Sequence, residues 1–358
     1  MCCAVGLRET RVGTRPSGWR SNSRVPHMWN EVRNVIKSCD AFLITTHINP
    51  DGDAIGSEVA MKAFLENLDK DAFIVNSSRT PDNLSFLDPE REIKLYPDDV
   101  DKKILDEVDA VFILDVNNWE HVGTFRNVLQ KDSLPRVCID HHLNASELVA
   151  DVIVSDETYA ATGMMVYDLI RSMDGEITRT ISEALYTALI ADTGTFRFSN
   201  TNARALRVAA ELAERGANPF ELHRRVFTNK TWGTGRLMGP VMGTLQSAFD
   251  GRVAWIMATL EMFQQARATY DDSDGFVDIV RTISGVELAL FFKEIPDGKI
   301  KVSLRSSGRV DAYEIANHLG GGGHRMASGV KMDGPINKAI ETVLGACREL
   351  GTPRFFED

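Results

Sequence analysis

Four short apolar runs of this 358-residue chain are each followed by acidic or histidine side chains. Buried charge is costly unless it is paired or bound to a metal, so a chain that needed only a stable core would have little reason for this arrangement. The candidate ligands are His47, Asp51, Asp53, Asp115, His141 and Asp192. Together they supply enough oxygen and nitrogen atoms for two divalent cations.

Mixed carboxylate and imidazole ligands without a thiolate suit Mn²⁺, Mg²⁺ or Fe²⁺ better than a structural zinc ion. Two such ions ~3.5–4 Å apart can activate a water molecule and hold the non-bridging oxygens of a phosphate. The pattern therefore predicts hydrolysis of phosphoesters. Asp140 is expected to orient an imidazole. His142 is the candidate catalytic residue, expected to contact the phosphate or protonate the leaving oxygen, and the alternative is a structural histidine.

One residue separates Asp51 from Asp53, and Pro50 and Gly52 favour a tight turn that directs both carboxylates to adjacent ions. The alternative is that both aspartates cap a helix that begins near Ala54, as Asp commonly does. The three other clusters of the same kind favour the metal interpretation.

From Met28 to residue 227, short apolar strands alternate with amphipathic helices, which is typical of a parallel sheet with helices on both faces. In such sheets ligands bind beyond the carboxyl ends of the strands, and we expect each cluster to lie there. The predicted helices cover residues 54–68, 160–172, 180–190, 202–214 and 219–226.

Residues 228–237 are rich in Asn, Lys, Thr and Gly and are predicted to form a connector. Residues 238–358 favour a smaller α+β domain, with strands at 253–260, 286–292 and 299–306 and helices at 310–319 and 336–350. The predicted fold class is therefore α/β, with an active-site cleft between the two domains. Residues 1–27 are arginine-rich and are expected to be a disordered tail; a transit peptide, or a true start at Met28, is the alternative.

Four consecutive glycines, Gly320–Gly323, favour a backbone that approaches a ligand closely, and their amides can bind an anion. The alternative is a flexible turn. Alternation along residues 300–305 places Arg305 on the face away from the core, either as a second phosphate ligand or as a solvated residue. The predicted substrate-binding residues are Arg305, Gly322, Gly323, His324 and Arg325.

The net charge of −11 argues against a long basic track for duplex DNA but allows small anionic substrates. No stretch approaches the ~18 apolar residues of a membrane span, so no membrane partner is expected. Five scattered cysteines favour a reducing compartment, and a cytoplasmic location is predicted.

Segments 47–57, 140–144 and 192–196, together with Asp115, resemble the four motifs of the DHH phosphoesterase superfamily. The resemblance covers most of residues 40–200 in the right order. It implies two Mn²⁺ ions per chain, with Mg²⁺ as the alternative. The implied ligand sets share Asp115, to which the first adds His47 and Asp51 and the second adds Asp53, His141 and Asp192.

Gly320–Gly329 with Arg305 is similar to the C-terminal domain of the subgroup that contains oligoribonucleases, phosphoadenosine-phosphate phosphatases and cyclic-dinucleotide phosphodiesterases. The resemblance implies an enzyme that hydrolyses short single-stranded oligonucleotides such as pApA to mononucleotides. The rivals are a phosphatase of 3′-phosphoadenosine 5′-phosphate, a cyclic-dinucleotide phosphodiesterase and a nucleotide-binding sensor with structural metals. The sequence leaves open whether the chain forms a homodimer. One departure is that Ala161–Met165 lacks an acidic residue that close relatives often carry.

Overall fold

The computed structural model describes residues 28–100, 102–116, 118–130, 134–142, 150–228, 230–323 and 325–351. The expected tail, residues 1–27, lies outside the described residues. The chain divides after Thr228 into two compact units, and each is described by itself.

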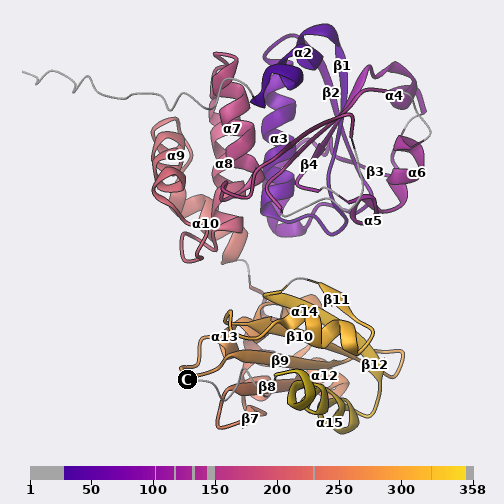
Figure 1. Ribbon diagram of the computed structural model, residues 1–358, viewed down its shortest axis with the longest axis vertical. Helices are drawn as coiled ribbons and strands as arrows, with labels where there is room; N and C mark the ends of the chain where they lie inside the picture. The colour runs from indigo at the N-terminus through magenta and orange to yellow at the C-terminus, as the bar shows by residue number, and fades with distance from the viewer. Residues whose placement is uncertain are drawn as a thin grey trace, which may run out of the picture. The chain divides into compact units, whose positions relative to one another are not determined.

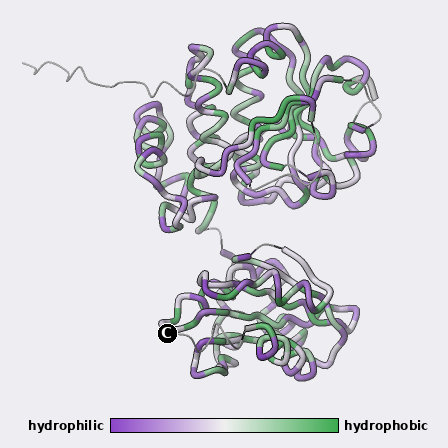
Figure 2. Tube along the Cα trace, in the orientation of Figure 1, coloured by the Kyte–Doolittle hydropathy of each residue, from purple (hydrophilic) through white to green (hydrophobic). Residues whose placement is uncertain are grey.

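The first unit contains a six-stranded sheet in the order β3-β2-β1-β4-β5-β6, in which all neighbouring strands are parallel. All five residues of β1 and of β4 are buried, as expected for central strands covered on both faces. Figure 2 shows these strands as a strongly hydrophobic bundle. The strands are β1 Ala41–Thr45, β2 Asp71–Asn76, β3 Lys94–Leu95, β4 Ala110–Leu114, β5 Arg136–Asp140 and β6 Val152–Ser155.

Helices cover both faces of this sheet (Figure 1). One face carries α2 Asn30–Ser38, α3 Gly52–Glu66, α7 Thr162–Ser172, α8 Arg179–Asp192, α9 Ala203–Glu214 and α10 Pro219–Phe227. The other carries α4 Lys102–Glu107, α5 Trp119–Val122, η2 Gly123–Phe125 and α6 Arg126–Leu129, while the short 3₁₀ helix η1 covers Asp82–Leu87. Gly56 allows α3 to lie close against α8, because a Cβ atom there would stand 2.4 Å from the carbonyl oxygen of Ala184.

The second unit contains a mixed six-stranded sheet in the order β11-β12-β10-β9-β8-β7, in which only the β8–β9 pair is parallel. Ile300, Val302 and Leu304 of β10 point into one core, and Ser303 and Arg305 lie on the other face. The strands are β7 Gln246–Ala248, β8 Val253–Ala258, β9 Leu288–Glu294, β10 Lys299–Ser306, β11 Gly322–Gly323 and β12 Ala327–Asp333. The helices are α11 Trp232–Met242, α12 Leu260–Ala266, η3 Asp271–Ser273, α13 Phe276–Arg281, α14 Ala312–His318, α15 Ile336–Ala346 and η4 Cys347–Gly351.

The predicted fold class, a parallel-sheet domain followed by a smaller α+β domain, is confirmed. The connector expected over residues 228–237 is helical from Trp232 onward, which corrects that prediction. Thr231 begins α11 by accepting a hydrogen bond from the Thr234 amide at 3.1 Å. No helix in the described ranges is both long enough and apolar enough to cross a membrane.

Candidate metal centre

The first three candidate ligands follow β1, with His47 and Asp51 in the loop and Asp53 in the first turn of α3. Asp51 begins α3, and its Oδ1 accepts hydrogen bonds from the amides of Asp53 (2.9 Å) and Ala54 (3.2 Å). The capping role considered for Asp51 is therefore real. It is compatible with metal binding, because these bonds use only one of the two carboxylate oxygens. His47 turns its Nε2 toward Asp115, whose Oδ2 lies 3.5 Å away.

Asp53 does not cap its own helix but faces the N-terminus of α7. Its carboxylate accepts hydrogen bonds from the amides of Thr162 (2.7 Å) and Gly163 (2.9 Å) and from the Ser57 hydroxyl (3.2 Å). The Thr162 hydroxyl also donates to Asp115 Oδ1 at 2.9 Å. Ala161–Met165, the stretch that lacks an acidic residue, thus supplies hydrogen-bond donors that fix the carboxylates of Asp53 and Asp115. The positive end of the α7 dipole faces these two carboxylates.

Asp115 follows β4 in a left-handed conformation (φ 59°), and its amide donates to the carbonyl of Ile139 at 3.0 Å. The residue is 3% exposed. A non-glycine residue in this region of backbone space is uncommon and concentrates at functional sites. The turn places the carboxylate between His47 and His141.

His141 and His142 follow β5 and are held by different partners. His141 Nδ1 lies 3.2 Å from the carbonyl oxygen of Tyr159, so that Nε2 faces the carboxylates of Asp192 (3.0 Å) and Asp53 (3.7 Å). His142 Nδ1 lies 2.7 Å from Asp140 Oδ1, and Asp140 therefore orients an imidazole as predicted. The His142 side chain is about half exposed.

Asp192 is the last residue of α8, so the prediction that every cluster follows a strand is wrong for this one. The helix carries Asp192 to the site because α8 packs on α3. A left-handed turn follows, with positive φ at Gly194, Thr195 and Phe196. Asn200 Nδ2 donates to the Asp192 carbonyl at 3.1 Å and holds this turn.

All six predicted ligands therefore converge at one end of the first sheet. Their candidate ligand atoms form two main groups, within each of which the atoms lie within 4.8 Å of one another. The groups are His47, Asp51 and Asp115, and Asp53, His141 and Asp192; a third combines Asp115 with His141 and His142.

The donor set fits hard or borderline divalent cations, because it consists of carboxylates and imidazoles. His141 Nε2 is buried and lies 3.0 Å from Asp192 Oδ2, 3.7 Å from Asp53 Oδ2 and 3.8 Å from Asp115 Oδ1. One imidazole faces three carboxylates there, so a cation among them would offset their negative charge.

The carboxylates of the cluster lie close together, and this raises the pKa values of several of its groups. Burial, reinforced by the carboxylate of Asp192, raises the pKa of Asp53 to about 7. Burial and the charge of Asp53 hold the pKa of Asp115 well above its usual range. For His141, burial is outweighed by the carboxylates of Asp192 and Asp53, and the pKa rises to about 10. Without metal, the cluster therefore attracts protons, which a cation would displace.

The predicted substrate-binding residues belong to the second unit. Arg305 Nε lies 3.8 Å from Asp278 Oδ1 of α13, and Gly322 and Gly323 form the exposed edge strand β11. Arg325 is exposed, with its guanidinium 3.4 Å from the carbonyl oxygen of Gly308. His324 lies outside the described residues.

Comparison with known proteins identifies the family. A model of the DHH family N-terminal domain matches residues 41–191, and a model of the DHHA1 domain matches residues 253–349. The bifunctional oligoribonuclease and PAP phosphatase NrnA of Thermus thermophilus is 35% identical over 92% of this chain and 97% of its own length. The chain belongs to the DHH family. The resemblance seen in the motifs is confirmed, and the protein is an enzyme of the phosphoesterase class.

Two further relatives extend over most of the chain. The NrnA protein of Bacillus subtilis is 26% identical over 85% of this chain and 93% of its own. The crystal structure of an exopolyphosphatase-related protein from Bacteroides fragilis superposes with a TM-score of 0.88 at 27% identity, covering 92% of this chain and 98% of that one.

Proposed function

We propose that this DHH-family enzyme hydrolyses short single-stranded oligonucleotides, such as pApA, to mononucleotides with two divalent cations. The observation that carries the proposal is the pair of ligand groups that meet around Asp115 and His141. The names of the Thermus and Bacillus relatives, both oligoribonucleases, support the choice of substrate.

The position of each side chain determines its proposed role. His47 and Asp51 would hold one cation, Asp53, His141 and Asp192 the other, and Asp115 would contact both. Such ions lower the pKa of an attacking water and neutralise the phosphate oxygens. Thr162 fixes the orientation of Asp53 and Asp115 from the start of α7.

His142 is the proposed proton donor to the leaving oxygen. Burial lowers the pKa of this imidazole, but the hydrogen bond to Asp140 and the charges of Asp115 and Asp140 together outweigh burial, and the net pKa is raised. A half-exposed imidazolium anchored through Nδ1 can reach a substrate and deliver a proton. In the second unit, Arg305 and Arg325 with Gly322 and Gly323 are proposed to bind a phosphate or nucleotide of the substrate, as is His324.

A second candidate activity is removal of a phosphate from 3′-phosphoadenosine 5′-phosphate, which the double name of the relatives favours. Both reactions would use the same metal cluster, and they differ in the phosphate attacked, which is a diester in the oligonucleotide and a monoester in phosphoadenosine phosphate. Mn²⁺ is the proposed metal, with Mg²⁺ as the alternative. A cytoplasmic location and a homodimer stay predictions.

Initial rates with added Mn²⁺ on a panel of pApA, longer oligonucleotides, cyclic dinucleotides, phosphoadenosine phosphate and pyrophosphate test the proposal. The expected result is the highest kcat/KM on di- to pentanucleotides or on phosphoadenosine phosphate, and little turnover of pyrophosphate. Turnover of pyrophosphate alone, or of no substrate in the panel, would contradict it.

A further inference from the structure

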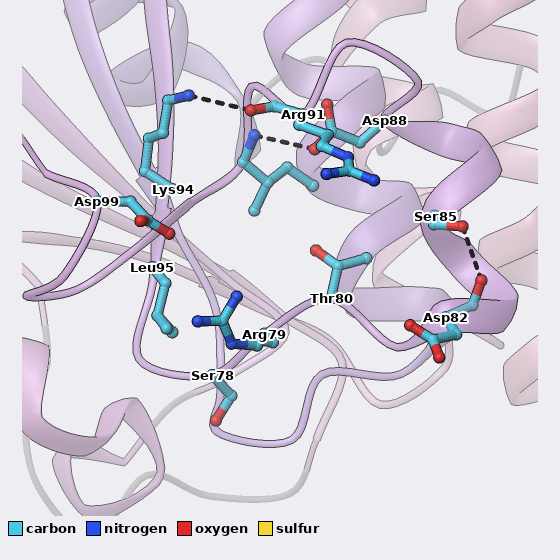
Figure 3. Close-up of a pocket in the computed structure, with 11 residues that line it drawn as sticks. Ser78, Arg79, Thr80, Asp82, Ser85, Asp88, Arg91, Lys94, Leu95 and Asp99 are labelled. Carbon is cyan, nitrogen blue, oxygen red and sulfur yellow. Dashed lines mark hydrogen bonds between the residues drawn. The ribbon is translucent and has the colours of Figure 1, made fainter.

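A cavity of about 660 Å³ lies wholly within the first unit, between the segment that follows β2 and the segment around β3 (Figure 3). Pockets that bind small molecules commonly measure roughly 300–1,000 Å³. None of the six metal-ligand candidates lines this cavity.

The cavity and the metal centre lie along the same edge of the sheet. β1 leads into the metal-binding loop, and its parallel neighbour β2 leads into Ser78 and Arg79 of the cavity wall. The two loops touch, because the Asn49 amide donates to Ser78 Oγ at 3.1 Å. β3 follows β2 with Val75 opposite Lys94, so Lys94 stands two strand spacings, roughly 10 Å, from β1. A ligand whose reacting group is at the metals could therefore extend into the cavity.

Three basic side chains line the cavity. Arg79 is exposed, and within the described residues its guanidinium makes no hydrogen bond or ion pair. Lys94 Nζ contacts the Arg91 carbonyl oxygen at 3.0 Å, as Figure 3 shows, and keeps two further donors. Arg91 has a left-handed backbone (φ 56°), which is uncommon for a long side chain and marks a constrained turn. The planar guanidinium group of arginine can donate two hydrogen bonds to one phosphate.

Three aspartates line the same cavity and restrict the ligand. Asp88 is engaged with the backbone, since its carboxylate accepts hydrogen bonds from the amides of Glu92 (2.8 Å) and Ile93 (3.0 Å). Asp82 and Asp99 add two further carboxylates. A bare anion would be repelled by these groups. A nucleotide would pair with both the basic and the acidic side chains of the cavity, because its phosphate pairs with arginine while its ribose hydroxyls donate to carboxylates.

We propose that this cavity binds the terminal phosphorylated nucleotide of the substrate while the scissile phosphate is at the metal centre. The inference rests on the proposed function and adds a subsite to it. Arg79 and Lys94 bind the terminal phosphate, and Asp99 accepts a hydrogen bond from the ribose.

The matched dinucleotides pApA and ApA, which differ only in the terminal phosphate, test the subsite. The readout is the ratio of kcat/KM for pApA to kcat/KM for ApA with Mn²⁺. We expect Arg79→Ala to lower this ratio about tenfold, mainly through KM for pApA, because a remote binding group is lost. The control is Lys37→Ala, which removes an exposed positive charge of α2 outside the cavity and is expected to leave the ratio at the wild-type value. An unchanged ratio in Arg79→Ala would overturn the subsite while leaving the proposed function intact.

Equilibrium binding in EDTA separates failure of the subsite from failure of the proposed function. Wild-type protein is expected to bind pApA more tightly than ApA, and Arg79→Ala to lose most of that preference. This result would support the subsite even if the enzyme turned over neither dinucleotide. Equal affinities of the wild-type protein for pApA and ApA would overturn it.

Discussion

Buried aspartates occur in both units of the molecule, and their surroundings are opposite. In the second unit, Asp272 accepts hydrogen bonds from the Thr269 amide (2.7 Å) and hydroxyl (3.0 Å), from the Thr234 hydroxyl (2.9 Å) and from Thr231. These donors outweigh burial, and the pKa of Asp272 falls to about 2. In the first unit, Asp115 has the Thr162 hydroxyl as a donor but lies among other carboxylates, and its pKa rises.

The difference teaches what separates a structural carboxylate from one that needs a cation. Asp272 has its donors from neighbouring threonines and holds together the start of α11 and the loop before η3. The carboxylates of Asp53, Asp115 and Asp192 lie close together, so all three cannot stay ionised unless positive charge is added. Metal binding is therefore expected to matter little for the Asp272 site and greatly for the Asp115 site.

The largest effect is expected at Asp115. Asp115→Asn removes the carboxylate that both cations would share, so kcat/KM for pApA should fall at least ~10³-fold, beyond the 10–100-fold typical of an outer-shell change. Because the change also removes a buried charge, thermal unfolding in EDTA should show a midpoint equal to or above that of wild type. Activity within tenfold of wild type would show that Asp115 is no shared ligand.

A third buried carboxylate, Glu58, has surroundings between these two cases. Asn76 Nδ2 donates to its Oε2 at 2.9 Å, but Oε1 has no hydrogen-bond partner within the described residues, and burial raises the pKa to about 8. Stability from the protonated form is full below about pH 4.5 and is lost as the pH rises through 8. Glu58→Gln should therefore be more stable than wild type at pH 9 by roughly 3–5 kcal/mol.

Urea unfolding of both proteins in EDTA measures the effect of Glu58. At pH 5 the two free energies of unfolding should differ little, because Glu58 is protonated in the folded state. A stability difference that is the same at both pH values would show that the Glu58 carboxyl does not titrate in the folded protein.

The smallest effect is expected at Asp272. Asp272→Asn replaces an acceptor by an amide that cannot accept from every threonine donor, and the free energy of unfolding at pH 7 should fall by about 2 kcal/mol. The loss should disappear as the pH falls through about 2, where the wild-type carboxyl is also protonated. Chemical unfolding measures the change in the free energy of unfolding. At a temperature where both proteins are folded, kcat/KM of Asp272→Asn for pApA should stay within about twofold of the wild-type value. A large loss of activity would end the distinction between the two aspartate sites.

The sequence predicted the elements whose pattern is local. Strand β10 has the predicted bounds because its apolar residues alternate strictly with polar ones. Asp115 and His141 follow an apolar strand directly, and His47 follows one after a single residue, so the sequence alone could propose them as ligands. Helix α11 was missed, since its glycines and Pro240 conceal a segment that begins with the Thr231 cap.

The contacts that the sequence could not predict join distant segments. Thr162 and Gly163 donate to Asp53, which is more than a hundred residues away, and only the packing of α7 beside α3 brings them together. A threonine at the start of a predicted helix was the one available signal. The cavity beside β2 likewise has no motif, because Arg79 and Lys94 meet only through the pairing of β2 with β3.

The most direct test of the metal centre is a calorimetric titration of the metal-free protein with Mn²⁺ at pH 8, with the number of bound ions per chain as the readout. Two ions should bind, with release of protons from the cluster that contains Asp53 and His141. A protein that binds no Mn²⁺ at millimolar concentration, or that binds two ions equally well after Asp115→Asn, would contradict a two-metal centre built around Asp115.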